Sequence, residues 1–138
     1  MESKIAILLT TFLRDDLLFR TLDTIVEFFP KDAILLIADQ GHTTEQKLIK
    51  IARIKEKIPC EYYQLEFDCG LSFARNYLVE KAQILNCQYC LLTADSIQFT
   101  EKYDFDAIIN FLDSDSTYGL VGLELFNSKC DWEYYLDL

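Results

Sequence analysis

Three short polar segments follow apolar runs in the sequence, and their side chains have the chemistry to hold a ligand. Thr10 and Thr11 end the first run, Asp39 and Gln40 end the second, and Asp95 follows a later one. Hydroxyl, amide and carboxylate groups form hydrogen bonds with polar ligands, and a carboxylate also binds divalent cations. An aspartate at a strand end also commonly caps the next turn. For both aspartates the two uses stay open at this point.

The elements that must position these groups alternate between strands and helices. Apolar runs of strand length predict strands at residues 4–10, 33–38, 61–66, 88–93 and 119–125. Apolar residues at helical spacing predict helices at 15–29, 43–57, 70–85 and 105–112. This alternation predicts an α/β fold, a mostly parallel sheet flanked by helices, as a single domain over residues 1–138. Ligands of such sheets bind outside the carboxyl ends of the strands, where the three polar segments lie.

Local signals also predict how two helices begin and which face a third one buries. Asp15 is expected to cap the first helix, and Thr43 with Gln46 has the spacing of a capping box for the second. Leu71 opens an apolar stripe on the third helix. The aromatic tail at 131–138 is expected to be extended.

The composition excludes several classes of protein. The chain has 138 residues, 13 Lys and Arg against 23 Asp and Glu, and a formal net charge of −10. Nucleic acid is therefore not an expected partner, because neutralising phosphates requires a basic face. The apolar runs are far shorter than the roughly 20 residues of a membrane helix, and residues 5–9 are too few for the core of a signal peptide. We expect a cytoplasmic protein.

The five cysteines are an odd number, which a secreted disulfide scaffold does not favour. Cys87 and Cys90 have the spacing of half a zinc site or of a redox pair. His42, the sole histidine, lies far away in the sequence, and no second pair of this spacing completes four zinc ligands. Because neighbouring strand residues face opposite ways, we expect free thiols that are buried or half-buried. The metal and redox uses stay open as alternatives.

Four sequence blocks occur in an order that is typical of a known family. They are IAILLTTFLRD at 5–15, IADQG at 37–41, GLSFARN at 70–76 and YCLLTADSI at 89–97. Together they resemble the blocks of family 2-type glycosyltransferases with the GT-A fold, closest to the N-acetylgalactosaminyltransferase-like branch. The similarity extends over about residues 4–126, and the GLSFARN block is its most specific part. The resemblance implies a Rossmann-like nucleotide-sugar-binding fold whose acceptor half is short or missing.

The resemblance also implies roles for the site residues. Thr10 and Thr11 would lie against the nucleoside, and Asp39 and Gln40 would hydrogen-bond the base or ribose. From the GLSFARN block, Arg75 and Asn76 would line the nucleotide pocket. The family holds Mn²⁺ or Mg²⁺ on the diphosphate with two or three carboxylates after the fourth strand, where this chain has one, Asp95. Such a metal neutralises the charge that develops on the leaving diphosphate.

Two functions follow as hypotheses from the resemblance. The first is a metal-assisted glycosyltransferase domain that transfers a sugar from a UDP-sugar to a hydroxyl of a saccharide or glycan acceptor. The second is a degenerate or truncated module that binds a nucleotide or a partner chain without catalysis, and the reduced acidic motif favours it. An exposed sheet edge would promote association, either between two copies or with an acceptor-binding part. The catalytic base is unassigned.

Overall fold

The computed structural model describes residues 5–122 of the chain. The chain divides into two compact units, Met1–Tyr103 and Asp104–Leu138, each of which is described by itself. The expected single domain over residues 1–138 stays a prediction.

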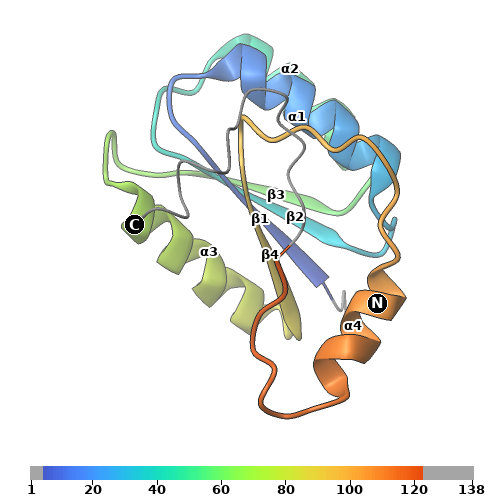
Figure 1. Cartoon of the computed structure of the whole chain (residues 1–138). Coiled ribbons are helices and arrows are strands. Elements are labelled where there is room, and N and C mark those ends of the chain that lie inside the picture. The colour runs from blue at the N-terminus through green and yellow to red at the C-terminus, as the bar shows by residue number, and fades with distance from the viewer. Residues whose placement is uncertain (1–4, 123–138) are drawn as a thin grey trace, which may run out of the picture. The chain divides into compact units, whose positions relative to one another are not determined.

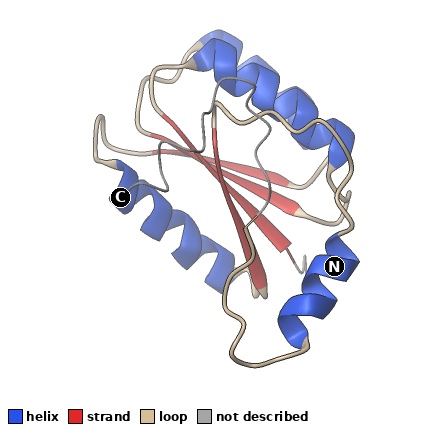
Figure 2. Ribbon diagram, in the orientation of Figure 1, coloured by secondary structure: helices blue, strands red, loops and turns tan. Residues whose placement is uncertain are grey.

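The first unit is built on a four-stranded sheet in which all neighbouring strands run parallel (Figure 2). The strands are β1 (Ile5–Thr11), β2 (Ile34–Asp39), β3 (Cys60–Gln64) and β4 (Tyr89–Ala94), in the order β3-β2-β1-β4. Consecutive strands are connected through helices, as parallel pairing requires. The predicted α/β fold with a parallel, helix-flanked sheet is confirmed.

The two central strands carry the core. All of β2 is buried, and so is all of β1 except its first residue. Helices cover both faces of a parallel sheet, which explains why the central strands are almost continuously apolar. At one edge of the described sheet, β4 is less covered and leaves the side chain of Leu92 52% exposed.

Three helices flank this sheet (Figure 1). The helices α1 (Asp15–Phe28) and α2 (Glu45–Lys55) contact each other and lie on one face of the sheet. On the other face α3 (Leu71–Ile84) packs against β1 and β2, with Ala74, Leu78 and Ala82 buried. The sheet is thus the middle of three layers. None of the helices within residues 5–122 combines the length and the apolar character needed to cross a membrane.

The second unit contains one helix among its described residues, α4 (Phe105–Asp113), where the sequence predicts one. Asp104 caps it, because its carboxylate accepts a hydrogen bond from the Ala107 N–H at 2.9 Å. Phe111 stacks on Tyr118 with the ring centroids 4.7 Å apart, which ties the end of the helix to the following turn.

Both predicted helix caps are wrong by one residue. The N-cap of α1 is Arg14 rather than Asp15, and no side chain caps it; Asp15 lies in the first turn. The N-cap of α2 is Thr44 rather than Thr43, and its hydroxyl accepts from the Lys47 N–H at 3.2 Å. Either threonine satisfies the local preference, and Thr43 instead bonds side chains of β3.

Two further expectations differ from the structure. Leu71, predicted on the buried stripe of α3, is 48% exposed, because it is the first residue of the helix. Of the strand predicted at 119–125, residues 119–122 are irregular, and the rest lies outside the described residues. The tail at 131–138 lies outside them as well.

Candidate functional site

The carboxyl ends of β1, β2 and β4 bring three of the predicted site residues together. Thr11 and Asp39 are register partners across the β1–β2 pair. The Thr11 hydroxyl donates a 2.8 Å hydrogen bond to Oδ2 of Asp95, which follows β4 directly. Although these residues lie far apart in the sequence, the parallel topology sets them side by side at one edge of the sheet.

The carboxylate of Asp95 is fully buried; its Oδ2 accepts a hydrogen bond, whereas its Oδ1 has an ion-pair partner but accepts no hydrogen bond within the described residues. Besides the Thr11 hydroxyl at Oδ2, the guanidinium Nη2 of Arg14 lies 2.5 Å from Oδ1. The Asp95 carbonyl accepts a 2.7 Å hydrogen bond from the hydroxyl of Thr21 on α1. A buried carboxylate costs free energy unless it is paired and hydrogen-bonded; Oδ2 is hydrogen-bonded, whereas Oδ1, among residues 5–122, depends on the charge of Arg14 alone.

Asp39 is also fully buried and is the centre of a second polar network. Its Oδ2 accepts from the Lys47 ammonium at 2.6 Å and from the Tyr62 hydroxyl at 2.7 Å, and its Oδ1 accepts from the Gly41 N–H at 2.8 Å. Burial, together with the bond to Asp39 and the charge of that carboxylate, raises the pKa of Tyr62, so the phenol stays a donor. The network ties the loop after β2 to β3 and α2.

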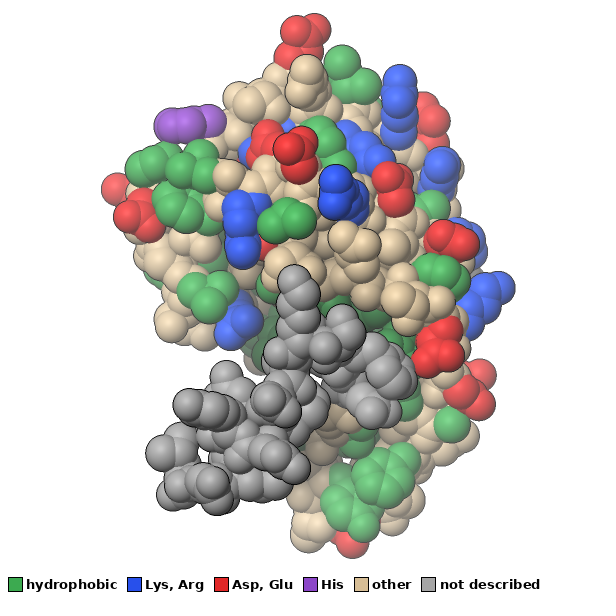
Figure 3. Space-filling view, turned by 45° about the horizontal axis from the view of Figure 1, so that its top comes forward, with side chains coloured by type: hydrophobic (Ala, Val, Ile, Leu, Met, Phe, Trp, Pro, Cys, Tyr) green, Lys and Arg blue, Asp and Glu red, His purple; other side chains and the backbone are tan. Residues whose placement is uncertain are grey.

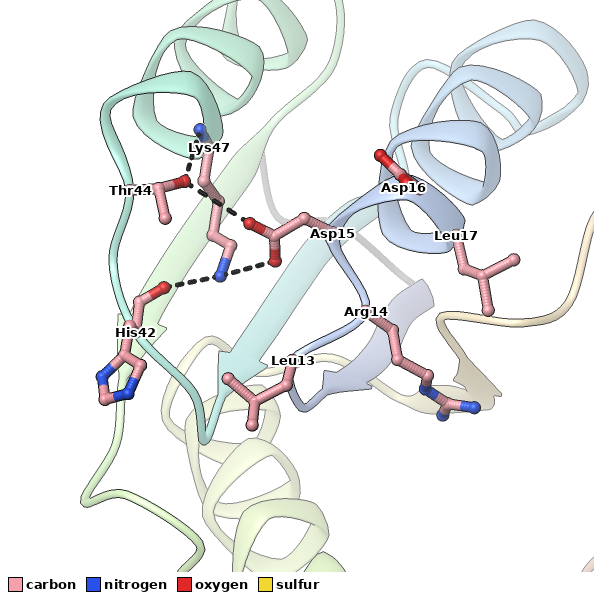
Figure 4. A pocket seen from close by; sticks show the side chains of 8 residues that line it. All are labelled: Leu13, Arg14, Asp15, Asp16, Leu17, His42, Thr44 and Lys47. Carbon is pink, nitrogen blue, oxygen red and sulfur yellow. Dashed lines mark hydrogen bonds and ion pairs between the residues drawn. The ribbon is translucent and has the colours of Figure 1, made fainter.

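The side chain of Lys47 is only 1% exposed although it carries a charge. Its ammonium bonds Asp39 at 2.6 Å. Figure 4 shows its bonds to the carboxylate of Asp15 at 2.9 Å and to the carbonyl of His42 at 2.7 Å. Burial lowers the pKa of Lys47, but the hydrogen bonds and charges of the two aspartates outweigh it, and the net shift is upward. Lys47 therefore stays protonated and joins the start of α1 to the end of β2.

Gln40 and Thr10 serve the scaffold of the sheet edge. The Gln40 side chain is 5% exposed, and its Oε1 accepts a 2.8 Å hydrogen bond from the N–H of Gly70, which precedes α3. The backbone N–H of Gln40 donates a hydrogen bond to the Thr11 carbonyl at 3.0 Å. Thr10 is 4% exposed and pairs in register with Ala94. These contacts hold the start of α3 against the ends of β1 and β2.

Arg75 and Asn76 lie in the first turns of α3, on the opposite face of the sheet from α1 and α2 (Figure 1). Arg75 is half-buried and Asn76 is exposed. The buried Nε of Arg75 has no hydrogen-bond partner within the described part of the chain. A cavity lies beside α1 and α2, and neither Arg75 nor Asn76 lines it.

An open cavity of about 440 Å³ lies between the start of α1 and the loop that leads into α2 (Figure 4). Side chains of both charges and of apolar type line it: Leu13, Arg14, Asp15, Asp16, Leu17, His42, Thr44 and Lys47. Its volume is within the range of small-molecule sites, roughly 300 to 1,000 Å³. The buried strand-end residues lie behind this wall rather than on it.

Figure 3 shows how one face of the molecule is charged. Acidic and basic side chains alternate over the helices there, and hydrophobic side chains gather next to the histidine. The cavity lining also contains side chains of both charges: the cations of Arg14 and Lys47 balance the carboxylates of Asp15 and Asp16. The lining is therefore close to neutral although the whole chain is strongly acidic.

Aromatic rings and a strained turn form the rim beside the cavity. Phe67 stacks on His42 at 4.8 Å between centroids and meets Phe12 edge-on at 5.4 Å. Leu13 has a positive φ of 54°, which costs a residue with a Cβ roughly 1–2 kcal/mol. A Cβ at Gly41 would come within 3.1 Å of the Leu13 side chain, so a larger residue there would have to shift its neighbours by a few tenths of an ångström. After this turn the Arg14 side chain points away from Lys47 (Figure 4), and its Nη2 lies 2.5 Å from Oδ1 of Asp95.

The residues at this edge do not fit a divalent metal in this arrangement. The predicted ligand Asp95 is buried, with one oxygen on the Thr11 hydroxyl and the other on the Arg14 guanidinium. Within residues 5–122, no three His, Cys, Asp or Glu side chains are grouped to hold an ion, and this includes the pair at Cys87 and Cys90. Both thiols are free; Cys87 is half-buried as expected, whereas Cys90, on the less covered strand β4, is exposed and differs from the expectation. Desolvation raises the pKa of each.

Arg14 and Lys47 were missed as site residues in the sequence. For Lys47 a signal existed, because it occupies the buried stripe of α2 together with Ile51 and Ile54, where an apolar residue is expected. A charged residue at such a position needs a buried partner. No comparable signal marks Arg14, which follows β1 in a loop and meets Asp95 only through the fold.

Known structures with a similar sheet include glycosyltransferases. The crystal structure of S. aureus TarS 1–349 matches with a TM-score of 0.66 at 18% identity, over 80% of this chain and 32% of that one. Its complex with UDP gives the same TM-score at 19% identity, again over 80% and 32%. The mannosyltransferase PcManGT from Pyrobaculum calidifontis, in complex with GDP-Man and Mn²⁺, matches with a TM-score of 0.62 at 14% identity, over 79% and 32%.

These identities are low, so the likeness establishes the fold, an α/β arrangement shared with GT-A-like glycosyltransferases. The chain spans about a third of the length of these neighbours. No family model and no curated protein matches the sequence.

Proposed function

We propose that the chain is the nucleotide-sugar-binding part of a glycosyltransferase and takes a UDP-sugar at the cavity beside α1. The observation that carries this proposal is the cavity itself, at the carboxyl edge of a parallel sheet, where the fold class binds its ligands. The similar structures solved with UDP and with GDP-Man support it, because both ligands are nucleoside diphosphates or their sugars.

The chemistry of the wall suits such a ligand. The N–H groups of the first turn of α1 lack a side-chain cap, and the guanidinium of Arg14 is next to them. Backbone N–H groups at a helix start and a guanidinium are both good donors to phosphate oxygens. The exposed rings of His42 and Phe67, stacked on each other, offer an aromatic surface to a base.

In this proposal the predicted nucleoside-contacting residues act from behind the wall. Asp39 holds the Gly41 N–H and Lys47, and it thereby shapes the loop that borders the cavity. Gln40 fixes the start of α3, which carries Arg75 and Asn76. Thr11 keeps Asp95 in place. The sugar donor, its acceptor saccharide and the residue that activates the acceptor hydroxyl are not assigned.

Thermal unfolding of the 138-residue chain with UDP tests the proposal. A ligand present at 100 times its Kd adds about 2.7 kcal/mol to the free energy of unfolding, so UDP should raise the Tm by several degrees. The substitution Leu13→Asp places a negative charge on the cavity wall, and aspartate tolerates a positive φ. It should weaken UDP binding about tenfold, a difference of about 1.4 kcal/mol.

Leu48→Asp is the matched control, because Leu48 is a leucine of similar exposure on α2 that does not line the cavity. Its UDP affinity should equal that of the unmodified chain. If UDP and GDP leave the Tm unchanged, with and without Mn²⁺, the nucleotide proposal is wrong. If Leu13→Asp binds UDP as well as Leu48→Asp does, the ligand binds elsewhere.

The second candidate, a module that binds without transfer, is favoured by Asp95, the one carboxylate of the expected metal motif, because it is buried and paired with Arg14. Incubation with a UDP-hexose or a UDP-N-acetylhexosamine separates the two. Release of UDP, faster than in the Leu13→Asp variant, supports the transferase. UDP binding without release supports the module.

A further inference from the structure

We propose that Arg14 takes the place of a divalent cation beside Asp95, so that the chain binds the diphosphate of its nucleotide without a metal ion. The inference rests on the proposed nucleotide site and assigns its phosphate-binding residue. It starts from the ion pair that joins the loop after β1 to the end of β4, with the Arg14 Nη2 2.5 Å from Oδ1 of Asp95.

Asp95 already has a cation beside the one carboxylate oxygen that accepts no hydrogen bond in the described part of the chain. Its side chain is 0% exposed, its second oxygen accepts from Thr11 at 2.8 Å, and its carbonyl is bonded by Thr21 at 2.7 Å. Mg²⁺ requires near-ideal octahedral oxygen geometry and gives up its waters reluctantly. To reach Asp95 it would have to displace the guanidinium from a buried carboxylate, and the two cations would repel each other.

Arg14, in contrast, has donors to spare. The side chain is 52% exposed and lines the cavity, while one terminal nitrogen is engaged with Asp95. A guanidinium has five N–H donors in a planar fork that matches the oxygens of a phosphate. Asp95 thus orients one end of the fork and leaves the rest for a ligand in the cavity.

Of the two cations that line the cavity, Arg14 is the one available to bind an anion. Lys47 also lines the cavity, but its ammonium is already bonded to Asp39, Asp15 and the His42 carbonyl. Asp16 adds a negative charge to the same wall. Without Arg14 the lining would be net negative and would repel a diphosphate, so the guanidinium of Arg14 supplies the attraction that a metal otherwise gives.

Calorimetric titration of the full 138-residue chain with UDP and with uridine, each in EDTA and in MnCl₂, tests the inference. The Kd for UDP should agree within about twofold between the two buffers, and UDP should bind more tightly than uridine. Arg14→Gln keeps an amide N–H for Asp95 and removes the charge. It should weaken UDP binding by about tenfold or more, the usual value of a hydrogen bond to a charged group, and leave uridine binding unchanged.

Arg20→Gln is the matched control, since Arg20 is an exposed arginine on α1 that does not line the cavity. It should bind UDP as the unmodified chain does. Arg14→Lys keeps the positive charge beside Asp95 but has no fork, and it should recover part of the UDP affinity. If Arg14→Gln fails to fold, the comparison of the two buffers and the lysine variant still decide the matter.

UDP binding that appears only with Mn²⁺ overturns the inference and leaves the proposed function intact. Loss of UDP and uridine binding by the same factor in Arg14→Gln also overturns it, because Arg14 would then act only on the fold. Absence of any UDP or GDP binding, in both buffers, overturns the proposed function and the inference with it.

Discussion

The buried lysine makes a prediction that depends directly on the geometry of the network. In Lys47→Met the apolar part of the side chain is kept and the ammonium is lost. Asp39, which is 0% exposed, then keeps the Tyr62 hydroxyl and the Gly41 N–H but has no counter-ion. Asp15, of which 31% is exposed, can turn to water. The cost therefore falls mainly on Asp39.

Breaking a buried ion pair by removing one partner costs roughly 3–5 kcal/mol, because a charge stays buried without compensation. The two remaining hydrogen bonds to Asp39 place Lys47→Met near the lower end, about 3 kcal/mol. For a chain of 138 residues the unfolding entropy is about 0.29 kcal/mol/K, at about 2.1 cal/mol/K per residue. The expected loss in Tm is therefore about 10 °C.

Lys50→Met is the matched control, because Lys50 lies on the same helix and its ammonium is also 2.6 Å from a carboxylate, that of Asp23. Asp23 is 64% exposed, and an exposed pair contributes less than about 1 kcal/mol. The Tm of this variant should fall by no more than about 3 °C.

The assay is thermal and urea-induced unfolding at neutral pH. Because the pKa of Lys47 is raised above its ordinary 10.5, its stabilisation is complete at that pH and is lost only as the pH rises past that value. Asp39→Asn combined with Lys47→Met removes both buried charges and should be more stable than Lys47→Met alone. Equal losses of stability in the two lysine variants would refute the reasoning, since burial is what distinguishes them.

Two further predictions concern the backbone and the thiols. Gly70 has a φ of 96° and a ψ of 147°, and a Cβ added there would meet no atom within 4 Å. In urea unfolding, Gly70→Ala should therefore lower the free energy of unfolding by about 1–3 kcal/mol from backbone strain alone, whereas Gly119→Ala, equally uncrowded and without a positive φ, should change it by no more than about 0.5 kcal/mol. Equal losses in the two variants would contradict the strain argument. Burial raises the pKa of Cys60 from 9.0 to about 11, so at pH 8 its thiolate fraction is about 100-fold lower than in the unfolded chain. Thiol labelling followed by mass spectrometry should therefore show Cys60 reacting more slowly by a similar factor in the native chain. Equal labelling rates in the native and the urea-unfolded chain would contradict the burial.

Much of the fold could be predicted because it depends on local patterns. The apolar runs of β1 and β2 are explained by burial on both faces, and the stripe of α3 at Ala74, Leu78 and Ala82 by contact with the sheet. Parallel pairing then follows from the alternation of strands with helices. The position of Asp39 and Asp95 at one edge follows in turn, because parallel strands end on the same side.

Which partner each of these groups takes was decided by the tertiary structure. Thr11 and Asp95 are 84 residues apart, and Tyr62 meets Asp39 across 23 residues. Leu13, next to Arg14, has a positive φ, a conformation that the residue type does not predict.

The amino-acid sequence alone thus determined the order of the elements and the edge of the sheet where the chemistry lies, since period and composition govern which residues are buried. The tertiary structure decided that both strand-end aspartates are buried and paired with Lys47 and Arg14. The physical reason is that an ion pair forms according to distance and solvent access in space, and these arise only when loops from separate strands pack together.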